Sequence, residues 1–234
     1  TTKQDETNTS QVDLMPGELI DKYTSVPAKA GYTYVAWSKS ATAFEPWDFK
    51  TDVFPEGTND LYLYAYMIEG EYTRVGTVQE LLAVANNPNG RYILVDDIDL
   101  KGKTYANSSP LGFQIKTTTT ETSVAFTGEF ISMGYKISNF TIIVQNSKKP
   151  VEAASGVTAI GALFPEVEGA IIKGFQVENA QAILTTTTSG KNIILGLGAA
   201  GLIGTIHEGS KNTIIEDIHV EFSVIASSPD QLSY

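Results

Sequence analysis

Ile172-Lys-Gly-Phe175-Gln-Val177 is one of three similar phrases in the C-terminal half of this 234-residue chain. The others are Ile137-Ser-Asn-Phe140-Thr-Ile142 and Ile215-Glu-Asp-Ile218-His-Val220, with apolar residues at the same offsets. A strand-length phrase that recurs without a helical period is typical of a solenoid, in which successive turns of chain stack on one another. The phrases therefore predict a short right-handed parallel β-helix, with these apolar residues stacked in rows in its core.

The spacing of the phrases predicts loops on this solenoid. The copies start 35 and 43 residues apart, longer than the ~20–25 residues of a bare turn. Polar segments rich in Thr, Ser and Lys are the candidates, namely 117–122, 146–156 and 185–192. Thr117 and Thr185 open two of these loops and are candidate ligand contacts.

A short helix is predicted just before the solenoid. Thr77-Val-Gln-Glu80 is a capping box, and Val78, Leu81, Leu82 and Ala85 place an apolar stripe on the turns that follow. We expect this helix to cover the open edge of the first turn. Residues 91–100 then read as the first long strand.

Residues 11–68 predict a separate small β module. Residues 31–37 and 61–66 alternate in the manner of strands. Trp37 and Trp47 are expected in the core, because so small a module has few other large side chains to bury. Residues 1–10 are interpreted as a flexible leader and 69–76 as a connector, which leaves 77–234 for the helix-capped solenoid.

The tyrosines of the second strand are a further candidate site. Tyr62, Tyr64 and Tyr66 share one face of that strand, and Leu61, Leu63 and Ala65 share the other. Exposed tyrosine rings can stack on sugar rings. These three residues join Thr117 and Thr185 as the predicted ligand contacts.

Composition excludes several functional classes. The net charge is −11 and the chain has no cysteine, which argues against a nucleic-acid partner, disulfides and thiolate chemistry. No apolar run is long enough for a transmembrane helix. A bacterial exterior fits these features, and a lipid-bearing cysteine ahead of Thr1 is a hypothesis for the anchor.

Three patterns are candidate chemical sites. Gly196-Leu-Gly198-Ala-Ala-Gly201 has the spelling of a dinucleotide site, but the β-branched residues that follow argue against the required helix. Asp96, Asp97 and Asp99 are candidate calcium ligands, with a solvated strand end as the alternative. His207 and His219 lack an evident triad. We therefore expect no cofactor, no metal and no catalysis.

The alternative is a polysaccharide lyase or glycosidase, which needs carboxylates converging across a sugar-sized gap. The available acids are Glu166, Glu168, Glu178, Glu216, Asp217 and Glu221. Lys136, Lys173 and Lys211 are the candidate bases. A converging pair of acids would favour hydrolysis over binding.

Two family resemblances follow from these residues. The series Gly31-Tyr32…Trp37, Trp47-Asp48-Phe49 and Leu61–Ala65 resembles the internalin B-repeat, also called the Listeria-Bacteroides repeat. That resemblance implies a β-grasp-like module of bacterial surface proteins. Residues 75–226 resemble the GLUG-repeat family through the marks Asp97–Leu100, Phe126-Thr-Gly128, Gly161–Phe164 and Gly201–Gly204.

The resemblances imply a bacterial cell-surface or secreted protein linked to adhesion. The predicted function is non-catalytic binding of an extracellular protein or glycan through the solenoid surface. Carbohydrate processing remains the alternative at this stage.

Overall fold

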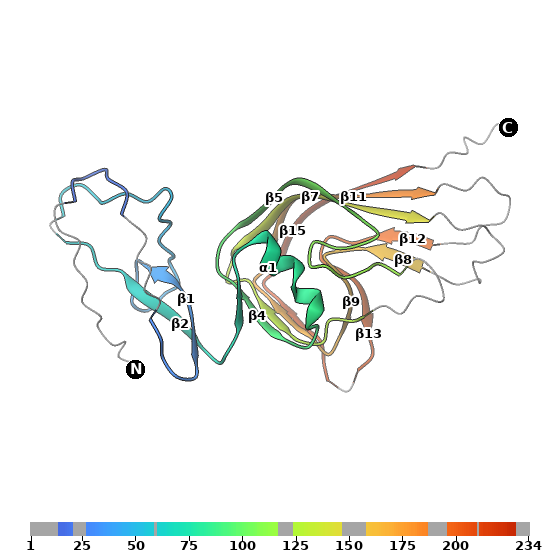
Figure 1. The fold of residues 1–234 in the computed structure, drawn as a ribbon, viewed down its shortest axis with the longest axis horizontal. Helices are drawn as coiled ribbons and strands as arrows, with labels where there is room; N and C mark the ends of the chain where they lie inside the picture. Colours follow the sequence, from blue (N-terminus) through green and yellow to red (C-terminus); the bar gives the residue numbers. More distant parts are fainter. Residues whose placement is uncertain are drawn as a thin grey trace. The chain divides into compact units, whose positions relative to one another are not determined.

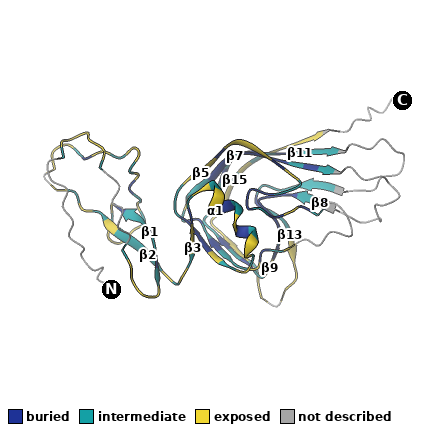
Figure 2. Ribbon diagram, viewed as in Figure 1, coloured by how far each residue is buried: buried dark blue, intermediate teal, exposed yellow. Residues whose placement is uncertain are grey.

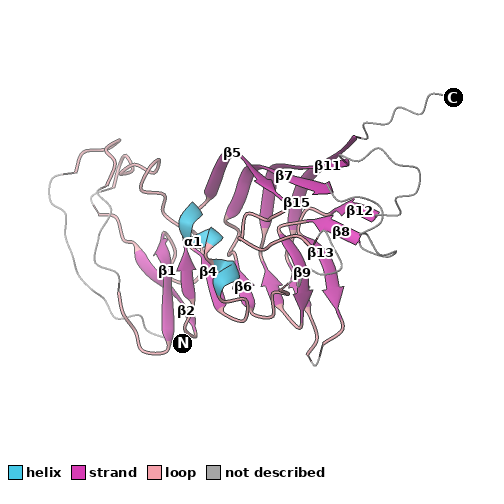
Figure 3. Cartoon of the chain, turned by 45° about the vertical axis from the view of Figure 1, so that its right-hand side comes forward, coloured by secondary structure: helices cyan, strands magenta, loops and turns pink. Residues whose placement is uncertain are grey.

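The computed structural model describes residues 14–20, 27–58, 60–116, 124–146, 158–186, 196–209 and 211–227. The chain divides into two compact units, Thr1–Tyr72 and Thr73–Tyr234. The described residues are mainly strand, with one short α-helix (Figures 1 and 3). The mainly-β prediction is confirmed.

The first unit is built on one antiparallel pair. β1 (Tyr32–Ser38) pairs with β2 (Tyr64–Glu69), and isolated bridges join Leu19 to Val53 and Ser38 to Pro46. Its described residues therefore form a two-stranded sheet braced by bridges. The strand predicted at 61–66 begins only at Tyr64, so Leu61–Leu63 precede the sheet.

The core of this unit is small, as its size requires. Val35, Trp47 and Phe54 are buried, and the Trp47 side chain is 8% exposed. Trp37 is only half-buried, and its ring packs edge-on against Tyr34 with centroids 6.0 Å apart. The Trp47 backbone N–H donates to the Trp37 carbonyl (2.8 Å), which joins the two segments.

The described residues of the second unit form four parallel sheets. The five-stranded sheet has the order β14-β10-β6-β4-β3 and the four-stranded sheet the order β15-β11-β7-β5, while β12 pairs with β8 and β13 with β9. The bounds are β3 (Thr73–Val75), β4 (Arg91–Leu94), β5 (Ile98–Ala106), β6 (Glu129–Ile131), β7 (Lys136–Asn146), β8 (Thr158–Gly161), β9 (Phe164–Glu168), β10 (Ile171–Lys173), β11 (Gln176–Thr186), β12 (Gly196–Ala199), β13 (Ile203–His207), β14 (Ile214–Glu216) and β15 (His219–Ser227). β3 lies within the predicted connector.

The chain visits these sheets in a repeating order. We call β4–β5, β6–β9, β10–β13 and β14–β15 the first to fourth passes. Each inter-strand pairing among them joins one pass to the next, so strands side by side in Figure 1 are about 40 residues apart in sequence. Residues pointing between the sheets then meet their counterparts from neighbouring passes.

Aromatic rings fill the centre of the second unit. Phe130, Phe164 and Phe175 are fully buried. Their centroids lie 5.0 Å (Phe130–Phe175) and 5.6 Å (Phe164–Phe175) apart, with rings at 82° and 83°. Edge-to-face packing of this kind adds to the apolar burial. Figure 2 shows stretches of buried residues, in dark blue, along the strands of the second unit.

Two of the three phrases align as the sequence predicted, and the first does not. Ile172 pairs with Ile215, but Ile137 pairs with Val177, and the counterpart of Ile172 one pass earlier is Phe130. The reason is turn length. Four residues separate β6 from β7, whereas two separate β10 from β11, so the first phrase lies wholly inside β7.

The burial of the predicted rows also differs along the stack. The six apolar residues from the first two phrases are buried. In the third phrase Ile215 is 40% exposed, and Ile218 and Val220 are half-buried. The fourth pass has a described neighbour on one side only, which explains the exposure.

The helix forms where the capping box predicted it, but it is short. α1 spans Val78–Leu82, and the 3₁₀ helix η1 spans Val84–Asn86. Thr77 Oγ1 accepts from the Glu80 N–H (3.2 Å), while Glu80 Oε2 accepts from the Gly76 N–H (2.9 Å). α1 contacts β3 and β5, the edge strands of the two large sheets.

The long strand predicted at 91–100 is two strands. β4 ends at Leu94 and β5 starts at Ile98. β4 pairs with β6 and β5 with β7, so the chain changes sheet between them. Asp96 lies in this corner, where its Oδ1 accepts from the Asp97 N–H (2.9 Å).

We expect Phe175→Ala to destabilise the second unit by about 3–5 kcal/mol, because the neighbouring passes cannot close the cavity it leaves. Phe175→Asp should leave these strands unfolded, since it buries an unpaired charge. Urea unfolding followed by circular dichroism measures both. Ile206→Ala, at a side chain 55% exposed, is the matched control and should change stability little. A Phe175→Asp protein that unfolds like the wild type would contradict the packing described above.

Candidate functional site

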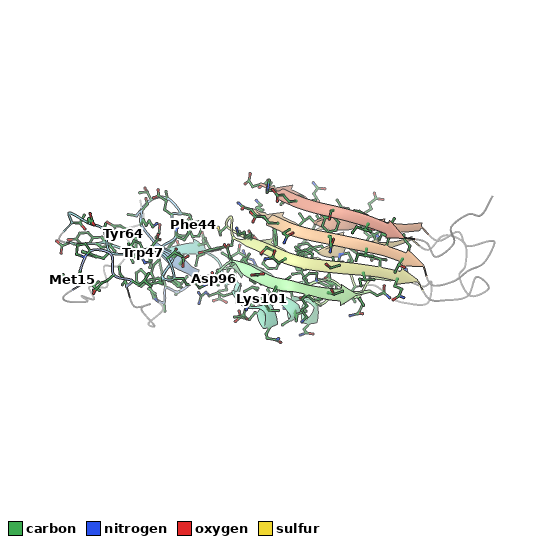
Figure 4. The ribbon with its side chains drawn as sticks, turned by 90° about the horizontal axis from the view of Figure 1, so that it is seen from above. Met15, Phe44, Trp47, Tyr64, Asp96 and Lys101 are labelled. Atoms are coloured by element: carbon green, nitrogen blue, oxygen red, sulfur yellow. The ribbon has the colours of Figure 1, made fainter. Side chains whose placement is uncertain are left out.

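A groove crosses the outer face of the four-stranded sheet. Its volume is about 420 Å³, and all four strands, β5, β7, β11 and β15, contribute to it. It is lined by Lys101, Gly102, Asn139, Phe140, Thr141, Asn179, Ala180, Gln181 and Ser223. We call it the cross-strand groove. Figure 4 shows the four strands side by side, with Lys101 labelled beside β5.

Stacked backbone irregularities create the hollow. Lys101, Asn139 and Asn179 have φ of 51°, 60° and 46°, in the left-handed region that asparagine tolerates better than most residues. The pairing register shifts at Asp99–Lys103 in β5 and at Val177–Ala180 in β11. Bulges at matching positions bend the strands together, and the sheet becomes concave there.

A hydrogen-bonded ladder runs along this hollow. Asn139 Nδ2 donates to Asp99 Oδ1 (2.7 Å), and Asn179 Nδ2 donates to Asn139 Oδ1 (2.5 Å). An ionised carboxylate only accepts, so Asp99 fixes which end of the Asn139 amide faces it. That choice fixes Asn179 in turn. The ladder therefore ends in Asn179 Oδ1, an acceptor without a hydrogen-bond partner among the described residues.

A second polar row lies beside the ladder. Thr104, Thr141, Gln181 and Ser223 are register partners across the four strands. Gln181 Nε2 donates to Thr141 Oγ1 (2.9 Å). The Gln181 Oε1 atom and the Ser223 hydroxyl have no hydrogen-bond partner in the part of the chain that the structure describes. This row thus also offers unused oxygen atoms to the groove.

An apolar row borders the polar ones. Ala106, Ile143, Ile183 and Ile225 are register partners two residues further along the strands, on the same face. Ile143 and Ile183 are half-buried, and Ile225 is 49% exposed. The outer face therefore combines hydrogen-bonding oxygens with a hydrophobic strip.

The charge at the groove is low. Lys101 is the charged residue among its described lining residues, and Asp99 lies next to it. The hydrogen bond from Asn139, followed by that from the Lys101 backbone N–H (2.8 Å), lowers the pKa of Asp99 from its usual 3.8. Asp99 is therefore ionised at neutral pH and holds the polarity of the ladder.

Three of the six candidate catalytic acids, Glu166, Glu178 and Glu216, contact a basic residue of a neighbouring pass. Among the described residues, ion pairs join successive passes at Arg91–Glu129 (2.8 Å), Lys136–Glu178 (3.0 Å) and Lys173–Glu216 (2.8 Å). His207 Nε2 lies 3.1 Å from Glu166 Oε2, also between successive passes. The hydrogen bonds to Glu178 and Glu216 raise the pKa of Lys136 and of Lys173, which is opposite to what a lysine base needs.

The predicted contact tyrosines differ in exposure. Tyr62 is 69% exposed and Tyr64 is 36% exposed. Tyr66 is half-buried, and its ring packs on Phe44 with centroids 4.9 Å apart. The three rings therefore do not form one exposed row, because Tyr66 is used in packing within the first unit.

The predicted contact threonines are not shown as loop residues. Thr185 lies in β11, paired with Gln145 and Ser227, so the loop expected at 185–192 cannot begin there. Asn146 likewise belongs to β7. Thr117 and the rest of the predicted loops lie outside the described residues.

The remaining sequence patterns have structural roles. Gly196–Ala199 is strand β12, and the following Ile203–His207 is strand β13, not the helix a dinucleotide site requires. Gly201 packs so closely on Val220 and Phe222 that a Cβ atom would collide with them. Asp97 Oδ1 accepts from the Lys136 N–H (3.0 Å). Within the described ranges no cluster of His, Asp and Glu could hold a metal ion.

The patterns in the sequence did not predict the cross-strand groove. Asn139 and Asn179 carry the only sequence signal, since they lie 40 residues apart, the length of one pass. The alignment of the three phrases does not reveal this correspondence, because it places the first phrase in the wrong register. In that alignment Asn139 corresponds to Gly174 and not to Asn179.

Comparison with known families places the first unit. Residues 2–66 match the Listeria-Bacteroides repeat domain, a domain found in bacterial surface proteins. This match confirms the resemblance predicted for that module. The matched range ends before the region that resembles GLUG repeats. No curated protein and no solved structure matches the chain. No described helix is long and apolar enough to cross a membrane.

We expect Asn139→Ala to move the pKa of Asp99 back up toward 3.8, because it removes the main hydrogen bond to the ionised carboxylate. A carboxyl group whose pKa is lower in the folded than in the unfolded state stabilises the folded protein at pH values above its unfolded-state pKa. That stabilisation is lost as the pH falls through its folded-state pKa. The stability difference between wild type and Asp99→Asn should thus narrow below about pH 4. Carboxyl NMR titration measures the pKa, with Asn212→Ala as the exposed-asparagine control. An unchanged Asp99 pKa in Asn139→Ala would refute the ladder.

Proposed function

We propose that this chain is a non-catalytic binding protein of the bacterial cell surface or exterior, in which a Listeria-Bacteroides repeat precedes a short right-handed parallel β-solenoid. The repeating order of parallel strands supports the solenoid. The repeat matched at residues 2–66 supports the surface location. The role in adhesion is part of this proposal.

The cross-strand groove is the observation on which the binding role rests. It brings side chains from all four strands of one sheet into a single concave surface. Binding sites of proteins typically combine an apolar wall with a few convergent polar groups. The isoleucine row and the unused oxygens of Asn179 and Gln181 supply both kinds of contact.

The arrangement of acids supports binding over carbohydrate cleavage. A glycosidase needs an acid and a second carboxylate facing one sugar bond. Glu166 pairs with His207 and Glu178 with Lys136, and these pairs lie in different sheets. The groove itself has no carboxylate among its described lining residues.

The test is a binding array of neutral glycans, anionic glycans and extracellular matrix proteins, probed with the whole chain. We expect at least one immobilised ligand to bind, and Asn179→Ala combined with Gln181→Ala to weaken it at least several-fold, since each lost hydrogen bond costs about 0.5–1.5 kcal/mol. Gln79→Ala removes an exposed amide on α1 and should bind like the wild type.

Two outcomes would overturn the proposal. Binding that survives the groove double variant but is lost in Tyr62→Ala would move the contact site to the first unit. Release of reducing sugars from a polysaccharide by the wild type would show catalysis. Each variant is checked for its native circular dichroism spectrum before it is used.

A further inference from the structure

Building on the proposed binding role, we infer that the cross-strand groove takes a neutral, hydroxyl-rich carbohydrate chain that lies across the strands, in the direction in which the passes stack. Four observations carry this inference. They are the direction of the groove, the polarity of its ladder, the pairing of its two central strands on both sides, and its charge.

The direction of the groove selects an elongated ligand. Its lining residues run from Lys101 on β5 through β7 and β11 to Ser223 on β15. Neighbouring strands lie ~4.8 Å apart, so the same kinds of side chain recur at that interval. A polymer with a short repeating unit presents recurring groups in the same way, whereas a compact metabolite meets only one or two strands.

The polarity of the ladder selects a ligand that donates hydrogen bonds. Asp99 draws the Asn139 amide N–H toward β5, and Asn139 draws that of Asn179. Gln181 donates one of its amide N–H groups to the Thr141 hydroxyl. Asn179 and Gln181 therefore present carbonyl oxygens to the groove. Each of these two amides also keeps a second N–H group. Sugar hydroxyls both donate and accept, so they match both kinds of group, whereas carboxylates and sulfates only accept.

The floor of the groove disfavours a peptide strand. An extended peptide binds a sheet by pairing with the free N–H and C=O groups of an edge strand. β7 and β11 are each paired on both sides, so their backbone groups are already used. Over these two central strands the groove therefore offers mainly side chains. The exposed Ile225 and half-buried Ile183 beside it suit the apolar faces of sugar rings.

Charge disfavours a polyanion. The chain carries a net charge of −11, which repels an anionic polymer at long range. Lys101 is the one cation among the described lining residues, and Asp99 lies beside it. Binding of anionic polymers depends on several clustered cations, whereas the described lining of the groove contains Lys101 alone.

The test compares neutral and anionic chains of equal length. Isothermal titration calorimetry with the full chain uses cellohexaose, xylohexaose and mannohexaose as neutral chains, together with any neutral glycan that binds on the array. Hexagalacturonate is the anionic chain. We expect a neutral chain to bind, hexagalacturonate to bind at least tenfold more weakly, and affinity to rise from disaccharide to hexamer. Asn179→Ala with Gln181→Ala should weaken binding about tenfold or more, while Gln79→Ala should not.

Asp99→Asn tests the polarity of the ladder directly. An asparagine at this position no longer obliges Asn139 to present its N–H, so the affinity for the neutral chain should fall several-fold while the circular dichroism spectrum stays native. If Asp99→Asn binds like the wild type, the polarity argument is wrong.

The outcomes separate this inference from the proposed function. Groove-dependent binding of an anionic glycan or a matrix protein, with no groove-dependent neutral glycan, would overturn the inference and leave the binding role standing. Ligand binding that is indifferent to the groove variants would overturn both. Equal affinity for disaccharide and hexamer would refute a chain lying across all four strands.

Discussion

Parallel pairing between successive passes is the constraint on which the second unit depends. A strand such as β11 is held by hydrogen bonds to β7 on one side and β15 on the other, so its residues must match both in register. Ile137, Val177 and Val220 meet for this reason. Ser132 shows how closely the turns are also tied, since its buried hydroxyl donates to the Gly174 carbonyl of the next pass (2.5 Å).

The same constraint explains how a surface feature forms from local sequence. A bulge in one isolated strand would only bend that strand. Because β5, β7 and β11 are paired, bulges at matching positions reinforce one another and hollow the sheet. The carboxylate of Asp99 then fixes the orientation of the Asn139 amide on β7 and, through it, that of the Asn179 amide on β11. Asp99 itself contacts only Asn139 of these two. Packing thus supplies the shape of the groove and electrostatics its chemistry.

Much of the fold was predictable from the sequence, and the groove was not. Alternating apolar residues identified most strands, and Thr77 with Glu80 identified the helix, because both signals are local. The register of Ile137 depended on the length of the turn at Ser132–Tyr135, which changes the alignment without changing the pattern. Thr185 looked like a loop residue because its neighbours are polar, yet pairing with Gln145 and Ser227 keeps it in β11. Asn139 and Asn179 can be recognised as partners in the ladder only when the pairing of β7 with β11 is known.

The uniform spacing of the passes has a consequence for how such a protein can change over generations. Each pass contacts its immediate neighbours, and the side chains that define the outer face recur about every 40 residues. Duplication of one such segment between β7 and β11 would lengthen the cross-strand groove by one strand width, ~4.8 Å, and leave the rest of the sheet intact. The length of the groove is therefore adjustable by gene duplication in small, discrete steps, without redesign of the core.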